Sequence, residues 1–248
     1  MFFGLQIILV ARDEIRKIKV IQASIAGQSL LLVRRSVTVV PTEKRMKSKA
    51  KLAVVEEPTP VRIDIGCGLN KRKDGDWIGV DKIAFDGADV ICDLATEKWP
   101  WKDSSVEEAN CSHFLEHLTN LNDRWERVHF FNELYRVLKP GAKCTLVLPH
   151  WASNRYYGDP THKEPFSEMG FYYLFREWRL GNAEKGLGAN APHADVKFNP
   201  KMYNCNFIAT WGYSMNPSIQ SRNSEYQQFA LQNYKEAATD MIATLVKD

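Results

Sequence analysis

The stretch Val61-Arg62-Ile63-Asp64-Ile65-Gly66-Cys67-Gly68 decides the fold. Its apolar residues alternate with Arg62 and Asp64, which is the pattern of a strand that enters a core. The two glycines that follow allow a sharp backbone turn and the close approach of a ligand. A dinucleotide-binding fingerprint needs a third glycine at the position of Lys71, so a nicotinamide oxidoreductase is disfavoured. The stretch therefore predicts a strand that ends at a nucleotide-type cofactor site, with an ordinary tight turn as the alternative.

Four segments carry a family resemblance. The stretch 64–68 and the sequence Gly79-Val80-Asp81 resemble the first two motifs of class I S-adenosylmethionine (SAM)-dependent methyltransferases. The segment 133–141, which ends in Leu-Lys-Pro-Gly, resembles the turn before the fifth strand of that family. The sequence Asp159-Pro160-Thr161-His162 is similar to a subgroup of bacterial and phage-type methyltransferases that carry it after the fifth strand. The resemblance implies that the chain binds SAM and transfers its methyl group.

The resemblance also implies which residues contact the cofactor. SAM has an adenosine, a cationic sulfonium and an amino-acid tail but no phosphate, so its site needs carboxylates and bare backbone. Four residues would form the loop over the tail: Asp64, Gly66, Cys67 and Gly68. Asp81 would accept the ribose hydroxyls from the tip of its strand. Asp93 would contact the adenine amine with Leu94 against the adenine face, and the alternative for Asp93 is a helix or turn cap.

The expected fold is an α/β, Rossmann-like, seven-stranded and mostly parallel sheet, with helices on both faces and a C-terminal antiparallel hairpin. The first connection is short, because the eight residues 69–76 are too few for an ordinary crossover helix. In this connection Asn70 or Lys71 could meet the SAM carboxylate. The apolar spacing predicts helices over 171–178 and from Ser224 through Leu245, and two short strands within 196–213.

The candidate catalytic residues follow two strands. His113 lies in the sequence Ser112-His113-Phe114-Leu115-Glu116-His117 at the predicted tip of the fourth strand, where open α/β sheets bind ligands. It is the first candidate for a general base, because histidine titrates near neutral pH. Asp159 and His162 lie in a long loop after the fifth strand and could orient the acceptor or take its proton. The alternative for these two residues is a turn closed by local hydrogen bonds.

The same hexapeptide matches the inverted zinc-protease pattern H-x-x-E-H. That pattern needs a long helix and a distant third ligand, whereas here it follows a strand and precedes a break, so zinc proteolysis is disfavoured. Some quinone-precursor O-methyltransferases carry a similar Glu/His cluster that holds a divalent cation, but His113 stands here where an acid would. We assign no metal ligand from the sequence and leave a divalent metal near His113, Glu116 and His117 open. The alternative is that Glu116 and His117 cap and orient the loop.

Charge and composition divide the 248 residues into three parts: an N-terminal extension 1–45, a linker 46–60 and a methyltransferase domain 61–248. Residues 1–45 carry a net charge of +5 and the remainder −2, so the domain lacks the basic footprint of a nucleic-acid binder. Because Met46 resembles a natural start, the extension is either a misassigned upstream segment, disordered or a small appendage. Met1–Val10 is too short to span a bilayer, and five scattered cysteines favour the reducing cytoplasm.

The acceptor is limited by two absent motifs. No Asn/Asp-Pro-Pro-Tyr/Phe sequence follows the fourth strand, which disfavours methylation of exocyclic base amines and of protein glutamine. No Pro-Cys dipeptide exists, so the covalent route to cytosine C5 lacks its nucleophile. The expected acceptor is a small metabolite or sugar, methylated on oxygen or nitrogen, with the oligomeric state open. The alternative function is a non-catalytic SAM- or nucleotide-binding module or partner subunit.

Overall fold

The computed structural model describes residues 19–25, 28–33, 53–56, 60–122, 124–184 and 202–248. The chain divides into two compact units, Met1–Thr59 and Pro60–Asp248. In the first unit three antiparallel strands pair in the order β2-β1-β3: β1 (Lys19–Ile25), β2 (Gln28–Val33) and β3 (Ala53–Glu56). These strands lie within the predicted extension and linker. The proposed partition at residues 45 and 60 stays a prediction, and the remaining residues of both segments, apart from Pro60, lie outside the described ranges.

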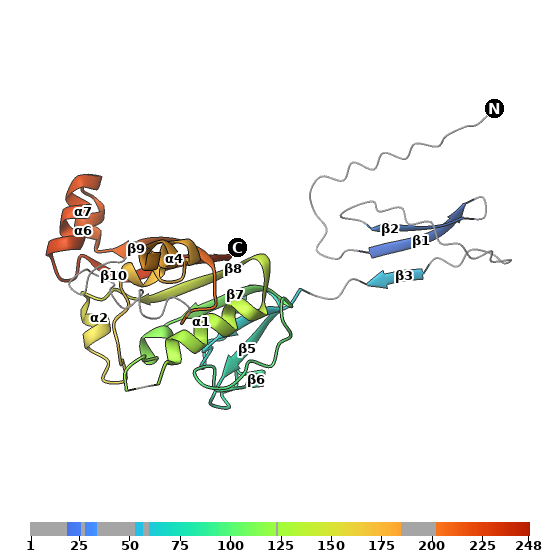
Figure 1. The fold of residues 1–248 in the computed structure, drawn as a ribbon, viewed down its shortest axis with the longest axis horizontal. Helices are drawn as coiled ribbons and strands as arrows, with labels where there is room; N and C mark the ends of the chain where they lie inside the picture. Colours follow the sequence, from blue (N-terminus) through green and yellow to red (C-terminus); the bar gives the residue numbers. More distant parts are fainter. Residues whose placement is uncertain (1–18, 26–27, 34–52, 57–59, 123, 185–201) are drawn as a thin grey trace. The chain divides into compact units, whose positions relative to one another are not determined.

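The second unit contains one seven-stranded sheet of order β6-β5-β4-β7-β8-β10-β9 (Figure 1). Its strands are β4 (Arg62–Ile65), β5 (Trp77–Asp81), β6 (Val90–Ile91), β7 (Val106–Ser112), β8 (Leu138–Pro149), β9 (Phe207–Met215) and β10 (Ala238–Lys247). The pairs from β6 to β8 are parallel, and β10 is antiparallel to both of its neighbours. The order reverses between β4 and β7, which is the point where ligands bind in open α/β sheets. The predicted Rossmann-like fold is confirmed.

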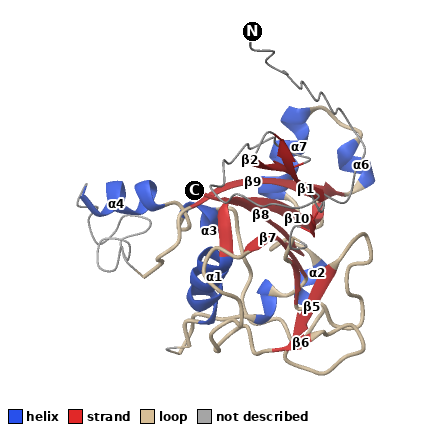
Figure 2. Ribbon diagram, turned by 90° about the vertical axis from the view of Figure 1, so that its right-hand side faces the viewer, coloured by secondary structure: helices blue, strands red, loops and turns tan. Residues whose placement is uncertain are grey.

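Few helices connect the parallel strands. The helices are η1 (a 3-10 turn, Leu115–His117), α1 (Glu126–Val137), α2 (Asn154–Tyr157), α3 (Met169–Tyr172), α4 (Arg176–Glu184), α6 (Pro217–Gln220) and α7 (Ser224–Asn233). The connections from β4 to β5, β5 to β6 and β6 to β7 contain only turns and bends, so the short first connection is confirmed. Figures 1 and 2 show α1 alongside the sheet near β7. No described helix combines the length and the apolar composition needed to cross a bilayer.

The core lies between α1 and the sheet. Phe130 and Phe131 of α1 are fully buried and meet edge to face, with ring centroids 5.2 Å apart. Trp99 packs edge to face on Phe130 at 5.5 Å, and its indole nitrogen donates a hydrogen bond to the Leu94 carbonyl. These contacts hold the helix-free β6–β7 connection against α1.

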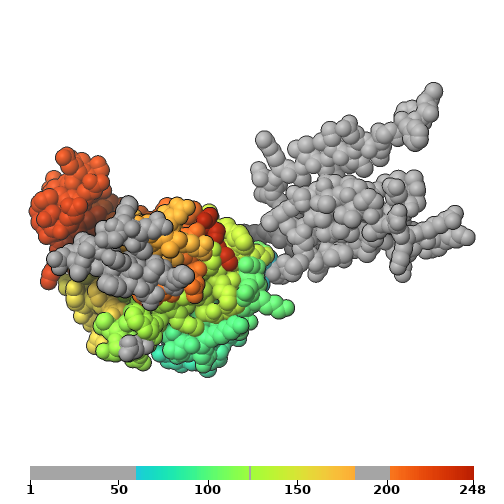
Figure 3. Space-filling view, in the orientation of Figure 1, coloured from blue at the N-terminus to red at the C-terminus, as the bar shows by residue number. Residues whose placement is uncertain are grey.

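Two sequence predictions near the C-terminus need correction. The predicted helix from Ser224 ends at Asn233, and Met241 and Leu245 lie in β10. Their spacing also fits a strand, because Met241, Ala243 and Leu245 alternate between buried and more exposed neighbours. The antiparallel C-terminal pair is confirmed, but α6 and α7 separate its strands in sequence, so it is not a hairpin. Figure 3 shows these two helices as a protruding red lobe of the second unit.

The predicted helix over 171–178 also differs. The structure has two helices there, α3 and α4, separated by residues 173–175. Phe171 and Leu174 are buried as expected, with exposed fractions of 2% and 0%. The part of the predicted strand region at 196–201 lies outside the described residues, and β9 accounts for the rest.

We expect Phe131→Ala to lower the free energy of unfolding by about 3–5 kcal/mol, since it leaves a cavity beside α1. Urea unfolding followed by circular dichroism measures this loss. Phe229→Ala is the matched control, because Phe229 is 50% exposed on α7. Equal unfolding midpoints for the two variants would contradict the placement of the core.

Candidate functional site

The backbone conformation of the turn after β4 favours glycine at two positions. Gly66 and Gly68 have φ values of +63° and +51°, in the left-handed region that favours glycine. A Cβ atom on Gly66 would lie 2.4 Å from Cδ2 of Phe114. The backbone N–H groups of Gly66 and Cys67 both donate to the Val80 carbonyl, at 2.8 and 3.2 Å. The turn is therefore fixed over the end of β5 and leaves bare backbone at the switch point.

Asp64 ties the first connection to the sheet. It is 4% exposed, and its Oδ2 accepts a hydrogen bond from the Arg72 backbone N–H at 2.8 Å. Its Oδ1 accepts one from Asn110 Nδ2 at 2.7 Å, on the neighbouring strand β7. Arg72 Nη1 in turn donates to Asn110 Oδ1 at 3.2 Å. This network closes the short connection without a helix.

A cavity of about 470 Å³ opens between the glycine turn and β7. Residues 64–70 and Arg72 line one side, and Asn110, Ser112 and His113 line the other, with Val147 of β8. Three of the predicted cofactor contacts after Asp64, namely Gly66, Cys67 and Gly68, therefore line the same cavity as His113, the first candidate base. The cavity therefore lies at the switch point between β4 and β7.

Asp81 lies beside this cavity rather than in its lining. Its Oδ2 accepts a hydrogen bond from Gly68 N–H at 3.1 Å, and its Oδ1 accepts one from Ile83 N–H at 3.0 Å. Each carboxylate oxygen keeps a second lone pair. Asp81 is thus attached directly to the glycine turn and can still accept hydroxyl donors.

In the structure Asp93 caps its own turn and Leu94 packs in the core. Asp93 Oδ1 accepts a hydrogen bond from Ala95 N–H and its Oδ2 accepts one from the Thr96 hydroxyl, both at 3.1 Å. This is the turn-capping arrangement that the sequence left as the alternative. Leu94 is 2% exposed and belongs to the core. The adenine contacts of these two residues stay a prediction.

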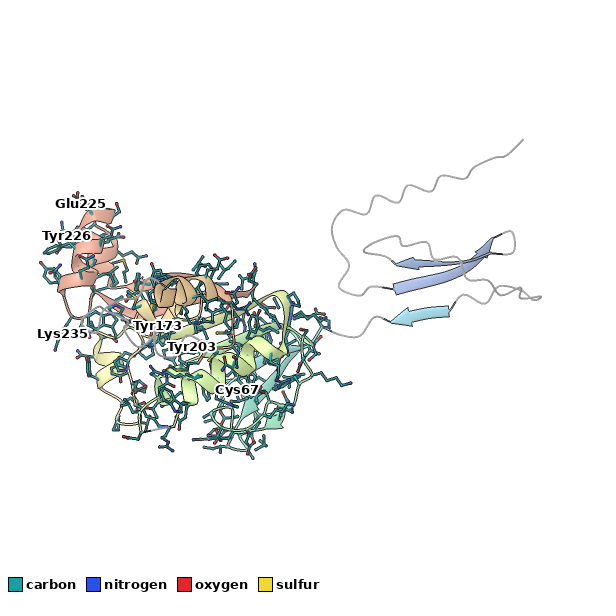
Figure 4. All side chains as sticks on the ribbon, viewed as in Figure 1. Cys67, Tyr173, Tyr203, Glu225, Tyr226 and Lys235 are labelled. Atoms are coloured by element: carbon teal, nitrogen blue, oxygen red, sulfur yellow. The ribbon has the colours of Figure 1, made fainter. Side chains whose placement is uncertain are left out.

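Cys67 serves the packing of the turn. Its thiol donates to the Gly87 carbonyl at 3.5 Å, and only Gly66 separates it from the end of β4 (Cys67 is labelled in Figure 4). Burial, with the neighbouring Asp81 charge, raises the pKa of Cys67 to about 11. The thiol is therefore neutral at physiological pH. All five cysteines are buried and free.

The structure separates the three consecutive basic residues of the first connection. Lys71 Nζ lies 2.8 Å from Asp89 Oδ2, and this contact lowers the pKa of Asp89. Arg72 lines the cavity, with its guanidinium over the Trp77 ring at 4.6 Å and hydrogen-bonded to Asp74. Sequence reasoning missed Arg72 and Asn110, because a run of basic residues gives no signal of which one faces inward. Asn70, named from the sequence, lines the cavity.

His113 is the candidate base that lines the cavity. It adopts φ +53°, a conformation that histidine and asparagine tolerate better than most residues, and its side chain is 38% exposed. Its Nδ1 lies 3.3 Å from Glu116 Oε1, and its Nε2 lies 3.8 Å from Asp240 Oδ1. The Glu116 contact favours the proton on Nδ1, which leaves Nε2 as the acceptor nitrogen.

Asp159 and His162 do not line the cavity. His162 lies near Glu116, and Asp159 lies near His162. His162 Nε2 lies 3.8 Å from both Glu116 Oε1 and Asp159 Oδ2. Asp159 accepts hydrogen bonds from the Thr161 N–H and hydroxyl, at 2.8 and 2.6 Å, which lower the pKa of Asp159. The three catalytic candidates therefore gather around Glu116, and His113 alone among them contacts the cavity.

Comparison with known proteins gives a family match over this part of the chain. Residues 26–146 match the family model described as "Methyltransferase domain". This segment is therefore similar to a methyltransferase domain. No curated protein matches the sequence.

Solved structures with similar folds include a SAM-dependent methyltransferase from Archaeoglobus fulgidus, at 18% identity and a TM-score of 0.47, with 76% of this chain and 86% of that chain covered. A SAM-dependent methyltransferase from Methanosarcina mazei is 16% identical, with a TM-score of 0.41 and coverages of 75% and 91%. Geranyl diphosphate C-methyltransferase from Streptomyces coelicolor is 14% identical, with a TM-score of 0.39 and coverages of 77% and 70%.

The geometry of the site fits SAM as the methyl donor. The left-handed glycine turn leaves space that a Cβ on Gly66 would fill, and the Asp81 carboxylate lies one hydrogen bond from the turn. Both features suit a ligand that presents hydroxyls and a cationic sulfonium rather than phosphates.

We expect Gly66→Ala to weaken SAM binding by the methyltransferase domain by roughly tenfold or more, because a left-handed alanine costs about 1–2 kcal/mol before the collision with Phe114 is added. Isothermal titration calorimetry measures the change. Gly212→Ala is the control, since a Cβ there meets nothing within 4 Å. Unchanged affinity in Gly66→Ala would contradict the role of the turn.

Proposed function

We propose that this chain transfers the methyl group of SAM to an oxygen or nitrogen atom of a small metabolite or sugar. One observation supports the proposal above the others: the cavity has the glycine turn on one side and the His113 imidazole on the other. A donor held at the turn and an acceptor held at His113 would meet within it. The acceptor classes disfavoured by the missing motifs remain disfavoured.

On the donor side, four features would hold SAM. The turn from Asp64 through Gly68 covers the tail, and Asp81 accepts the ribose hydroxyls. Arg72 and Asn70 face the cavity and would bind the tail carboxylate, with the Arg72 guanidinium oriented by Asp74 and Asn110. Asp93 and Leu94 are proposed for the adenine. SAM supplies an electrophilic methyl on its sulfonium, and the chain supplies alignment, which can lower a barrier by roughly 7–11 kcal/mol.

On the acceptor side, His113 would accept the proton of the attacking hydroxyl or amine at Nε2. Its Nδ1 faces Glu116, which orients the ring and stabilises the imidazolium that forms. His162 and Asp159 act outside the cavity, since His162 contacts Glu116 and Asp159 contacts His162. We assign them to positioning of the acceptor-side loop.

Calorimetry tests the donor half of the proposal. We expect the wild-type chain to bind SAM and its demethylated product, and Asp81→Ala to weaken binding by about 10- to 100-fold through loss of charge-assisted hydrogen bonds. Asp86→Ala is the control, because Asp86 is exposed in the same connection. Absence of heat with both compounds in the wild-type protein would refute the cofactor assignment.

Methyl transfer tests the acceptor half. The wild-type chain should move label from methyl-labelled SAM into a component of a metabolite extract. His113→Asn should lower kcat by about 10²- to 10⁴-fold with little change in SAM affinity, since asparagine tolerates φ +53°. His129→Asn on α1 is the control. Tight SAM binding without transfer to any extract component would favour the alternative, a non-catalytic binding module.

A further inference from the structure

The loop after β8 brings a second histidine to the Glu/His pair of η1. Ligand atoms of Glu116, His117 and His162 all lie within 4.8 Å of one another. The two segments are held together by the backbone, because Lys163 N–H donates to the Glu116 carbonyl at 2.8 Å. The cluster therefore joins residues 45 or more positions apart in sequence into one small volume.

Glu116 is the residue that makes this cluster unusual. Its side chain is 2% exposed, and neither of its carboxylate oxygens receives a hydrogen bond. Its nearest nitrogen contacts are His113 Nδ1 at 3.3 Å and His162 Nε2 at 3.8 Å. A buried carboxylate held only by these longer contacts is costly, so it needs a closer positive partner.

His162 presents a lone pair to that carboxylate. Its Nδ1 lies 2.7 Å from the Tyr156 carbonyl, which can only accept, so Nδ1 carries the proton. In the neutral ring Nε2 is then an acceptor, and it faces Glu116 and Asp159 oxygens at 3.8 Å each. A backbone carbonyl on the far nitrogen is the arrangement that orients metal-bound histidines.

Nearby cationic side chains have other partners. Lys163 Nζ pairs with Glu126 Oε2 at 3.1 Å. Arg127 donates to the Glu164 and Pro165 carbonyls and lies 3.7 Å from Glu164 Oε2. The Arg127 charge acts on Glu116 through space, but neither side chain forms an ion pair with it.

We propose that Glu116, His117 and Nε2 of His162 bind one first-row divalent transition-metal cation, for which Zn²⁺ is the probe. Two imidazole nitrogens and one carboxylate suit such a cation, whereas Mg²⁺ and Ca²⁺ prefer oxygen ligands throughout. Ligand atoms around a tetrahedral Zn²⁺ lie about 3.3 Å apart, so the side chains must close by up to about 1.5 Å. The cation clamps the Asp159–His162 loop to η1 and holds Glu116 against His113.

Calorimetric titration of the chelator-treated full chain with Zn²⁺ alone tests this site. We expect one Zn²⁺ per chain, little heat with Mg²⁺, and a rise in melting temperature on Zn²⁺ addition. Glu116→Gln and His162→Asn should each weaken Zn²⁺ binding by more than about 100-fold, beyond the loss seen for residues that only orient ligands. His129→Asn, which lies on α1 with Nε2 at the Glu97 carbonyl, should bind as the wild type does.

Nitrogen NMR of the wild-type histidine rings keeps the test decisive if a variant does not fold. Zn²⁺ should shift Nε2 of His162 and one ring nitrogen of His117, while Nδ1 of His162 stays protonated. The proposal fails if Zn²⁺ does not bind, if Mg²⁺ binds equally well, or if His162 carries protons on both nitrogens and so balances Glu116 itself. The measurements contain no SAM, so their outcome is separate from that of the proposed function.

Discussion

The buried carboxylate of Asp64 is the constraint on which the site depends. Its two oxygens hold the Arg72 backbone and the Asn110 side chain, and so join the end of β4 to the first connection and to β7. A chain with a full helix after β4 would fix that connection by packing. Here two hydrogen bonds to Asp64 fix the connection instead, because it is too short for a helix. Since removal of one partner leaves a buried charge unpaired, the network acts as a unit.

The cavity follows from this network. With Arg72 drawn inward, it joins Asn70 and the glycine turn in one wall of the cavity. The opposite wall comes from the end of β7, where His113 turns out of the strand in a left-handed conformation. The residues proposed for the donor and for the acceptor are therefore carried by neighbouring strands at the switch point, and His162 of the loop after β8 lies 3.8 Å from Glu116.

The sequence predicted those features that depend on local chemistry. Alternation and glycine freedom predicted the strand and the glycine turn at 62–68. The count of eight residues predicted the short first connection, and the tip of the fourth strand predicted the place of His113. The sequence could not choose Arg72 over Lys71, because the choice depends on which side chain Asp89 pairs with across the sheet. It misassigned Met241 and Leu245, because their spacing fits a helix and a strand equally. The convergence of Glu116 with His162 depends on tertiary packing of two segments 46 positions apart.

The place of β10 between β8 and β9 has a consequence for synthesis. β10 is paired on both sides, yet it follows the α6–α7 lobe in the chain. A nascent polypeptide that has left the ribosome only as far as Asn233 presents two unpaired strand edges with no partner between them. Such edges invite association with other chains, so protection during translation would be needed until β10 emerges.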